Sequence, residues 1–136
     1  MRFFLCLYLL LLSACGASSL QNSATSATLT KSLLIGTATT SDLFCTEDEV
    51  RAADDPTRRA EACLIVAEGY ETAIASWQLW VESTLAVAED EEAVEAARQL
   101  AAPSIRFLLE TSQLLRESGV DVPEVPEILV RFLEGL

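Results

Sequence analysis

Histidine is absent from this chain of 136 residues. Its absence excludes Ser-His-Asp and Cys-His catalysis as usually built, and also the Glu-x-x-His signature of di-metal helical bundles. The sequence also has no phosphate-binding P-loop and no glycine-rich dinucleotide turn. Carboxylates are plentiful, but they follow solvated helix faces and helix starts rather than a site for acid–base work. We therefore assign no catalytic residue and no cofactor, and an enzyme is the least favoured class.

Positive charge is scarce as well. The chain has 9 Lys and Arg residues against 21 Asp and Glu residues, a net charge of −12, and Lys31 is its one lysine. Such a charge disfavours nucleic acid and bare anionic lipid as partners. One basic cluster, which lies among acidic residues, consists of Arg51, Arg58 and Arg59. We expect these arginines to form local ion pairs, and the alternative is a patch that binds an anion or a partner protein.

Long apolar runs are limited to one, Phe3–Leu12, which follows Arg2. A charged start and an apolar stretch of this length are typical of a signal peptide. The run is too short to span a bilayer, which needs about 20 apolar residues. Directly after it comes Leu12-Ser13-Ala14-Cys15. A branched apolar residue, two small residues and a cysteine in this order resemble the lipobox of bacterial lipoproteins.

The resemblance implies that residues 1–14 are removed and that Cys15 carries thioether-linked diacylglycerol, with a further acyl chain such as palmitate on the new N-terminus in many species. An ordinary secretory signal is the alternative. The enteric members of the family typically have Asp after the cysteine as an inner-membrane retention signal, whereas this chain has Gly16. We therefore expect a protein anchored in the cell envelope, at the outer membrane facing the periplasm if the cell is Gram-negative.

Processing would leave 122 residues (136 minus 14), which is one small domain. Losing Arg2 changes the net charge from −12 to −13. Residues 15–26 comprise the lipidated cysteine and a small, polar stretch that is typical of a flexible tether. The expected folded domain is 27–136.

Two cysteines remain once Cys6 has left with the signal and Cys15 carries lipid: Cys45 and Cys63. An even pair in an oxidising compartment favours a disulfide, with buried free thiols as the alternative. The bond would close a loop of about 19 residues and stabilise the fold by roughly 3 kcal/mol. No histidine is present to complete a metal site with them.

Apolar residues recur every three or four positions, which predicts helices throughout. The strongest stripe predicts a helix over 56–88, and it runs through Cys63, Val66, Tyr70, Ile74, Trp77, Val81 and Leu85. A second stripe starts near Asp90 and passes Pro103, where we expect a kink or two helices sharing a face. Shorter helices are predicted over 27–44, 46–53 and 126–134. The expected fold is all-α: a small bundle of about four helices, two of them long and antiparallel, after a flexible N-terminal tether.

Three side chains are candidates for contacting a partner. Trp77 lies on the core stripe, whereas Trp80 is about 60° away from it, at the edge. Because tryptophan is enriched at interface hot spots, Trp80 is the first candidate, with core packing as the alternative. Arg98 and Arg106 lie roughly on one side of the next helix, where solvent exposure is the default. The acidic run Glu89–Glu92 is a helix start, with a bound cation such as Ca²⁺ as the alternative.

Together these features predict a membrane-anchored lipoprotein that works by binding, as a scaffold or assembly accessory for an envelope protein. Pilotins, the small helical lipoproteins that escort secretins, are similar in their plan of anchor, tether and bundle. A blocker or immunity factor against phage or toxin is the alternative. A hydrolytic enzyme is less favoured, because it would need an acidic cleft with perturbed carboxylates.

Overall fold

The computed structural model describes residues 18–136. These residues form six α-helices and one 3₁₀-helix, in the order α2 (Ser19–Phe44), α3 (Glu47–Ala52), α4 (Pro56–Ala86), α5 (Glu91–Ala97), η1 (Arg98–Ala101), α6 (Ala102–Glu117) and α7 (Glu127–Glu134). No strand occurs within this part of the chain. The predictions for the signal peptide, the lipobox and Cys15 fall outside the described residues.

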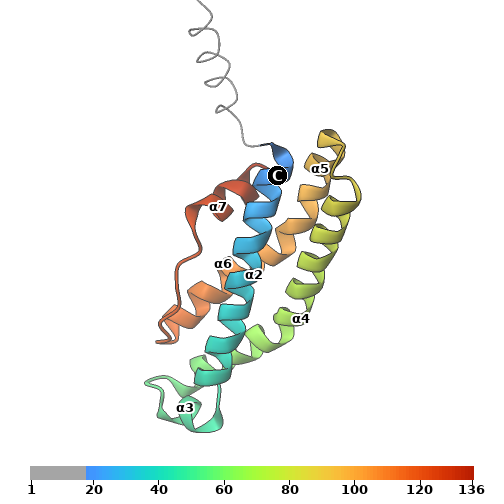
Figure 1. Ribbon diagram of the computed structural model, residues 1–136. Helices are drawn as coiled ribbons and strands as arrows, with labels where there is room; N and C mark the ends of the chain where they lie inside the picture. The colour runs from blue at the N-terminus through green and yellow to red at the C-terminus, as the bar shows by residue number, and fades with distance from the viewer. Residues whose placement is uncertain (1–17) are drawn as a thin grey trace, which may run out of the picture.

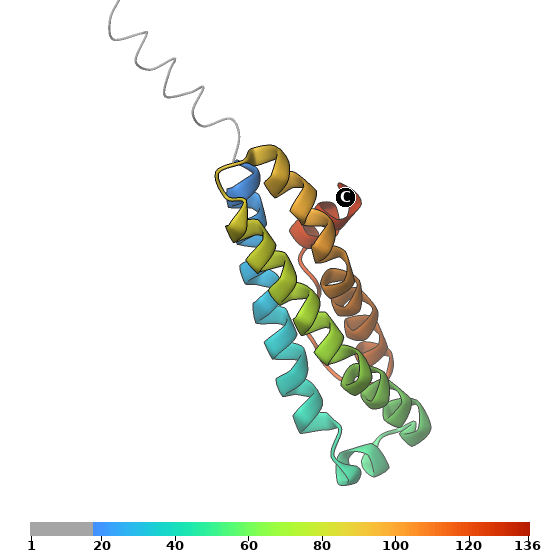
Figure 2. The same cartoon turned by 90° about the vertical axis from the view of Figure 1, so that its right-hand side faces the viewer.

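The bundle has three long arms (Figure 1). Helix α2 runs one way, α4 returns antiparallel to it, and α5, η1 and α6 together form the third arm. Helix α3 lies at one end of the bundle and α7 lies near the other (Figure 2), and Figure 1 shows α7 beside α2. The predicted all-α bundle with two long antiparallel helices is confirmed.

Side-chain caps mark the starts of α3, α4 and α5. The hydroxyl of Thr46 accepts a hydrogen bond from the Glu49 amide (3.3 Å), and the carboxylate of Asp55 accepts one from the Arg58 amide (3.0 Å). Asp90 caps α5 in the same way. Each cap satisfies amides that the first helical turn leaves unpaired, which fixes where the helix begins.

The predicted break at Pro103 takes the form of two helices. Helix α5 ends at Ala97, η1 spans one tight turn, and α6 begins at Ala102 with Pro103 in its first turn. Proline fits there because the first turn has no amide to lose. Gly119 ends α6 with φ of 85°, the left-handed conformation expected of a glycine just past a helix.

Helix α2 corrects the boundaries predicted for the tether. It begins at Ser19, so residues 19–26 are helical and belong to the bundle rather than to a linker. Ser18 caps it in a capping box with Gln21. The buried positions are spaced 3, 4 and 4, which is one face of a helix: Ser23, Ser26, Thr30 and Leu34. Small side chains on this face let α2 approach its neighbours closely.

Helix α4 is buried along a different line from the predicted stripe. It packs against α2 on one side and α6 on the other, and the seam between them is marked at intervals of seven by Arg59, Val66, Ala73 and Trp80. The predicted stripe shares Val66 with this seam, and its other positions flank the seam and are partly exposed, with Leu85 left 67% exposed. Small residues such as Ala73 lie at the centre of the buried face, where the helices pack closely. The prediction followed the larger apolar side chains and therefore placed the buried face incorrectly.

Candidate functional site

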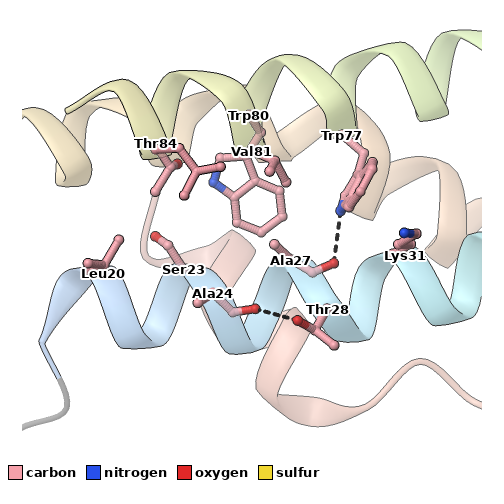
Figure 3. Close-up of a pocket in the computed structure, with 11 residues that line it drawn as sticks. Leu20, Ser23, Ala24, Ala27, Thr28, Lys31, Trp77, Trp80, Val81 and Thr84 are labelled. Atoms are coloured by element: carbon pink, nitrogen blue, oxygen red, sulfur yellow. Dashed lines mark hydrogen bonds between the residues drawn. The ribbon is translucent and has the colours of Figure 1, made fainter. Parts of the chain in front are cut away.

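A groove of about 370 Å³ lies between the first half of α2 and the last third of α4 (Figure 3). Its walls are mostly apolar, because α2 offers alanines where α4 offers aromatic and branched side chains. The groove is lined by Leu20, Ser23, Ala24, Ala27, Thr28, Lys31, Trp77, Trp80, Val81, Thr84 and Leu85. The small side chains of Ala24 and Ala27 leave the space that the groove occupies.

Trp77 is held in place at one end of the groove. Its indole Nε1 donates a hydrogen bond to the carbonyl of Ala27 (2.8 Å), and the ammonium of Lys31 lies 5.2 Å from the ring centroid. A cation at this distance from an indole face is attracted to it. These contacts join α2 to α4 and orient the half-buried ring against the groove, as Figure 3 shows.

Trp80 is completely buried, which contradicts its prediction as an exposed partner contact. Its ring packs against Phe132 of α7 with centroids 5.3 Å apart. The physical reason is the shifted seam of α4: the position 60° from the predicted stripe is the centre of the packed face, not its edge. The alternative, core packing, is the one that holds for this side chain.

Three polar atoms at the base of the groove have no hydrogen-bond partner: Ser23 Oγ, Thr84 Oγ1 and Trp80 Nε1. Their side chains are 1%, 6% and 0% exposed. Figure 3 shows the Trp80 nitrogen facing the part of the groove that Ser23 and Thr84 border. Leaving a buried donor or acceptor unpaired costs about 1–3 kcal/mol each, so this position favours a group that can pair with them.

The two arginines predicted to grip a partner are not brought together. Arg98 packs over the ring of Phe132, with its guanidinium carbon 4.3 Å from the centroid, and pairs with Glu95. Its side chain is only 17% exposed, so it serves the junction of η1 with α7. Arg106 is exposed on α6 and makes none of the ion pairs found within residues 18–136. Arg98 is the first residue of η1 and Arg106 lies in α6, so the change of helix type breaks the shared helical face.

At the opposite end of the bundle, Cys45 and Cys63 form the predicted disulfide. It joins the end of α2 to the second turn of α4. Beside it the predicted local ion pairing of the basic cluster holds for Arg51, which pairs with Glu47, whereas Arg58 pairs with Glu117 of α6.

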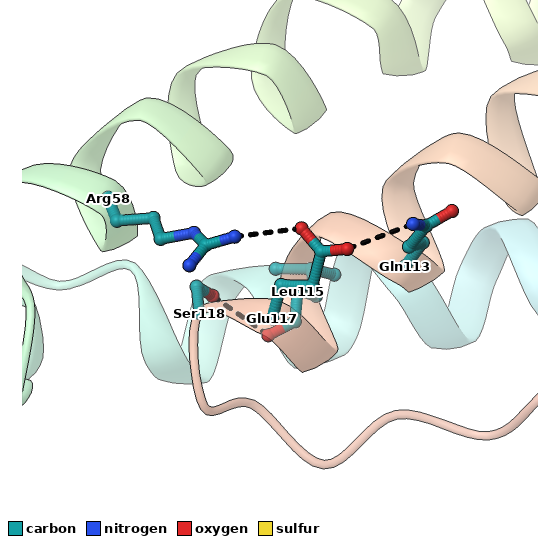
Figure 4. A network of polar contacts seen from close by, with 5 residues as sticks. All are labelled: Arg58, Gln113, Leu115, Glu117 and Ser118. Atoms are coloured by element: carbon teal, nitrogen blue, oxygen red, sulfur yellow. Dashed lines mark hydrogen bonds and ion pairs between the residues drawn. The ribbon is translucent and has the colours of Figure 1, made fainter.

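Buried Arg59 is part of this end. Its Nε donates to the carbonyl of Ser118 (3.0 Å), which caps the C-terminus of α6 with a positive charge. Figure 4 shows the adjoining network, in which Glu117 accepts from Gln113 (2.9 Å) and from Arg58 (3.0 Å). These hydrogen bonds, that of Gln113 first, lower the pKa of the Glu117 carboxyl below its ordinary value.

The acidic run Glu89–Glu92 has structural roles. Asp90 accepts from the amides of Glu92 and Ala93 (both 3.1 Å), and Glu91 accepts from the Ser19 amide at the start of α2 (3.4 Å). No group of three or more acidic or cysteine side chains suited to a metal ion occurs within residues 18–136.

Two surface hollows outside the groove are each bordered by a pair of carboxylates. Glu89 and Asp90 border one beside the turn after α4, and Glu110 and Glu124 border another. In the first, Asp90 is engaged in capping, and in the second, Glu124 pairs with Arg116 at 3.6 Å. Neither pair therefore presents two unengaged carboxylates for acid–base chemistry.

Sequence reasoning missed the α2 wall of the groove, because its small polar residues were interpreted as a tether. The spacing of Ser23, Ser26 and Thr30 was the signal that could have revealed it. None of the described helices is long and apolar enough to cross a membrane. Comparison with protein-family models, with curated proteins and with solved structures finds no match to this chain.

Proposed function

We propose that this protein is a lipid-anchored envelope lipoprotein that works by binding, as a scaffold or assembly accessory rather than an enzyme. The proposed anchor is lipid on Cys15, and the proposed location is the periplasmic face of the outer membrane if the cell is Gram-negative. The observation that carries the proposal is the sequence Leu12-Ser13-Ala14-Cys15, which ends three residues before the capped start of the bundle.

The disulfide supports an envelope location. Disulfides persist in oxidising compartments and are rare where thiols are kept reduced. Cys45 and Cys63 are bonded across the end of a small domain, as is common in exported proteins.

The groove between α2 and α4 supports a binding role. It combines apolar walls with a few buried polar atoms, the usual composition of a ligand site. Anchoring would concentrate the groove at one membrane face, so that even a weak contact there gains effective affinity.

The anchor is tested by replacing Cys15 with Ala and following the protein through a detergent phase separation. The wild-type protein is expected in the detergent phase and the Cys15→Ala protein in the aqueous phase. Unchanged partitioning would show that lipid on Cys15 is not the anchor.

The binding role is tested by crosslinking in intact cells, followed by mass spectrometry of the proteins attached to this chain. A reproducible envelope partner is expected, and a deletion strain should be impaired in assembly or secretion. Sensitivity of the deletion strain to phage or toxin, with assembly intact, would instead indicate a blocker.

A further inference from the structure

The groove opens close to the proposed lipid attachment point. Leu20, at one end of the groove, follows Cys15 by five residues, which span at most about 18 Å even when fully extended. The groove then follows α2 as far as Lys31, a length of about 16 Å at the helical rise. A lipid on Cys15 is therefore within reach of the groove of its own chain.

The order of polar and apolar groups along the groove suits an acyl chain. Ser23 and Thr84 lie near the Leu20 end, and with Trp80 Nε1 they supply the three unpaired polar atoms. Beyond them the walls are made by Ala27, Val81 and the ring of Trp77, with Thr28 and Lys31 at the far end. An acyl group can pair with the unpaired atoms, because its carbonyl oxygen lies at the attached end and the hydrocarbon follows.

We propose that one acyl chain carried by Cys15 docks in the α2–α4 groove of the same molecule. Its carbonyl oxygen accepts from Trp80 Nε1, a group that can only donate. Its hydrocarbon then lies against Ala27, Val81 and the ring of Trp77. This inference rests on the proposed function, since it requires the lipid on Cys15.

The charge of the protein argues against the bilayer itself as the occupant of the groove. A chain with a net charge of −12 is repelled by anionic phospholipid, and Glu82, Glu89 and Glu92 lie on the surface at this end of α4 and the start of α5. A tethered acyl chain can reach the groove without bringing this surface to the headgroups. Any second and third acyl chains stay in the membrane, and two chains suffice for stable anchoring.

The test uses the full-length chain, expressed in cells fed a fatty acid with a photoactivatable diazirine near its end. Cells are irradiated, and the mature protein is digested and analysed by mass spectrometry. We expect an intramolecular crosslink between the lipidated N-terminal peptide and α4 between Trp77 and Leu85. Because the diazirine reacts with whatever lies beside it, the products report the location of the chain in every case.

Filling the groove should abolish this crosslink. Ala24→Phe places a ring in the groove from an exposed position on α2, and Thr28→Phe does so one turn further along. Ala67→Phe makes the same change on an exposed face of α4 outside the groove and should keep the crosslink. Helical circular dichroism identifies any variant that fails to fold, and the other groove variant then decides.

The outcomes separate this inference from the proposed function. An N-terminal peptide with no lipid mass on Cys15 would refute the anchor and the docking together. Lipid on Cys15 with crosslinks only to phospholipid or to other proteins would keep the anchor and overturn the docking. Crosslinks that join two copies of this chain would also overturn it, in favour of exchange between molecules.

Discussion

The two ends of the bundle differ in how their polar groups are satisfied. At the disulfide end, where α4 begins and α6 ends, the Cys45–Cys63 bond and the Arg59 hydrogen bond to Ser118 join different helices. At the groove end, where α2 begins and α4 ends, the buried oxygens of Ser23 and Thr84 are unpaired.

The difference separates stability from binding. Buried polar groups in folded proteins are nearly always hydrogen-bonded, so three unpaired atoms gathered in one place call for an explanation. The disulfide end has the covalent bond and the charged cap that hold the fold together. The groove end can therefore retain unpaired polar atoms, which form hydrogen bonds only when a ligand enters the groove.

Trp80 gives the strongest test of whether the groove end is nonetheless a packed core. Trp80→Ala removes a fully buried ring that packs on Phe132, and we expect a loss of about 3–5 kcal/mol in the free energy of unfolding. Leu79→Ala, at a neighbouring side chain that is 53% exposed, should change it by less than about 0.5 kcal/mol. Urea denaturation measures both. Equal small losses would mean that Trp80 is not packed as described.

Removing the disulfide should weaken the opposite end. Replacing Cys45 and Cys63 with Ser should lower the free energy of unfolding by about 3 kcal/mol, because an unfolded chain without the loop has more conformations. Both tryptophans lie in the last third of α4, whereas Cys63 lies in its second turn, so the fluorescence of the folded protein should not change. A shifted emission spectrum in the folded variant would show that the two ends are coupled.

Arg59 tests the polar part of the disulfide end. Arg59→Ala leaves the Ser118 carbonyl without its charged donor and should cost about 1.5–3 kcal/mol in thermal or urea unfolding. Arg58→Ala removes an exposed pair with Glu117 and should cost less, since solvent screens such pairs. The interpretation of Arg59 as a cap is wrong if the two losses are the same.

Two buried serines sharpen the comparison most directly. Ser104 Oγ donates to the carbonyl of Ala73 (2.8 Å), whereas Ser23 Oγ has no partner, and both side chains are at most 1% exposed. Ser104→Ala should lose about 0.5–1.5 kcal/mol of stability. Ser23→Ala should be neutral or stabilising in the same unfolding assay, because it removes an unsatisfied group. A matching loss at Ser23 would show that its hydroxyl is hydrogen-bonded in the folded protein, so that the groove end would not keep it unpaired.

The sequence predicted the features that depend on neighbouring residues. The helix start at Glu89–Glu92 and the break at Pro103 both depend on interactions within one or two helical turns. The cysteine pair was predictable because export and lipidation would leave two cysteines.

The packing line of α4 and the groove could not be predicted in the same way. Which face of α4 is buried depends on having neighbours on two sides, and that information lies in α2 and α6. Trp80 was therefore placed at an edge when it lies at the centre. Residues 19–26 of α2 were not predicted to be helical. Serine and alanine are common both in flexible tethers and in close helix interfaces, and the sequence of this segment does not distinguish the two unless the partner helix is known.

Glu117 gives the smallest expected effect, a pH dependence confined to the disulfide end. Hydrogen bonds from Gln113 and Arg58 lower the pKa of this carboxyl below its ordinary value of 4.5. A carboxylate with a lowered pKa in the folded state stabilises it at pH above the ordinary value, and this stabilisation is lost as the pH falls through the lowered pKa. In thermal melts from pH 6 to pH 3, the wild type should therefore lose slightly more stability than Glu117→Gln, which cannot titrate.

Gln113→Ala, which removes the main cause of the pKa shift, should lose an amount of stability between these two. Parallel curves of stability against pH for all three proteins would show that the fold does not favour the charged form of Glu117. The disulfide end would then be stabilised by Arg59 and the disulfide, with no contribution from Glu117.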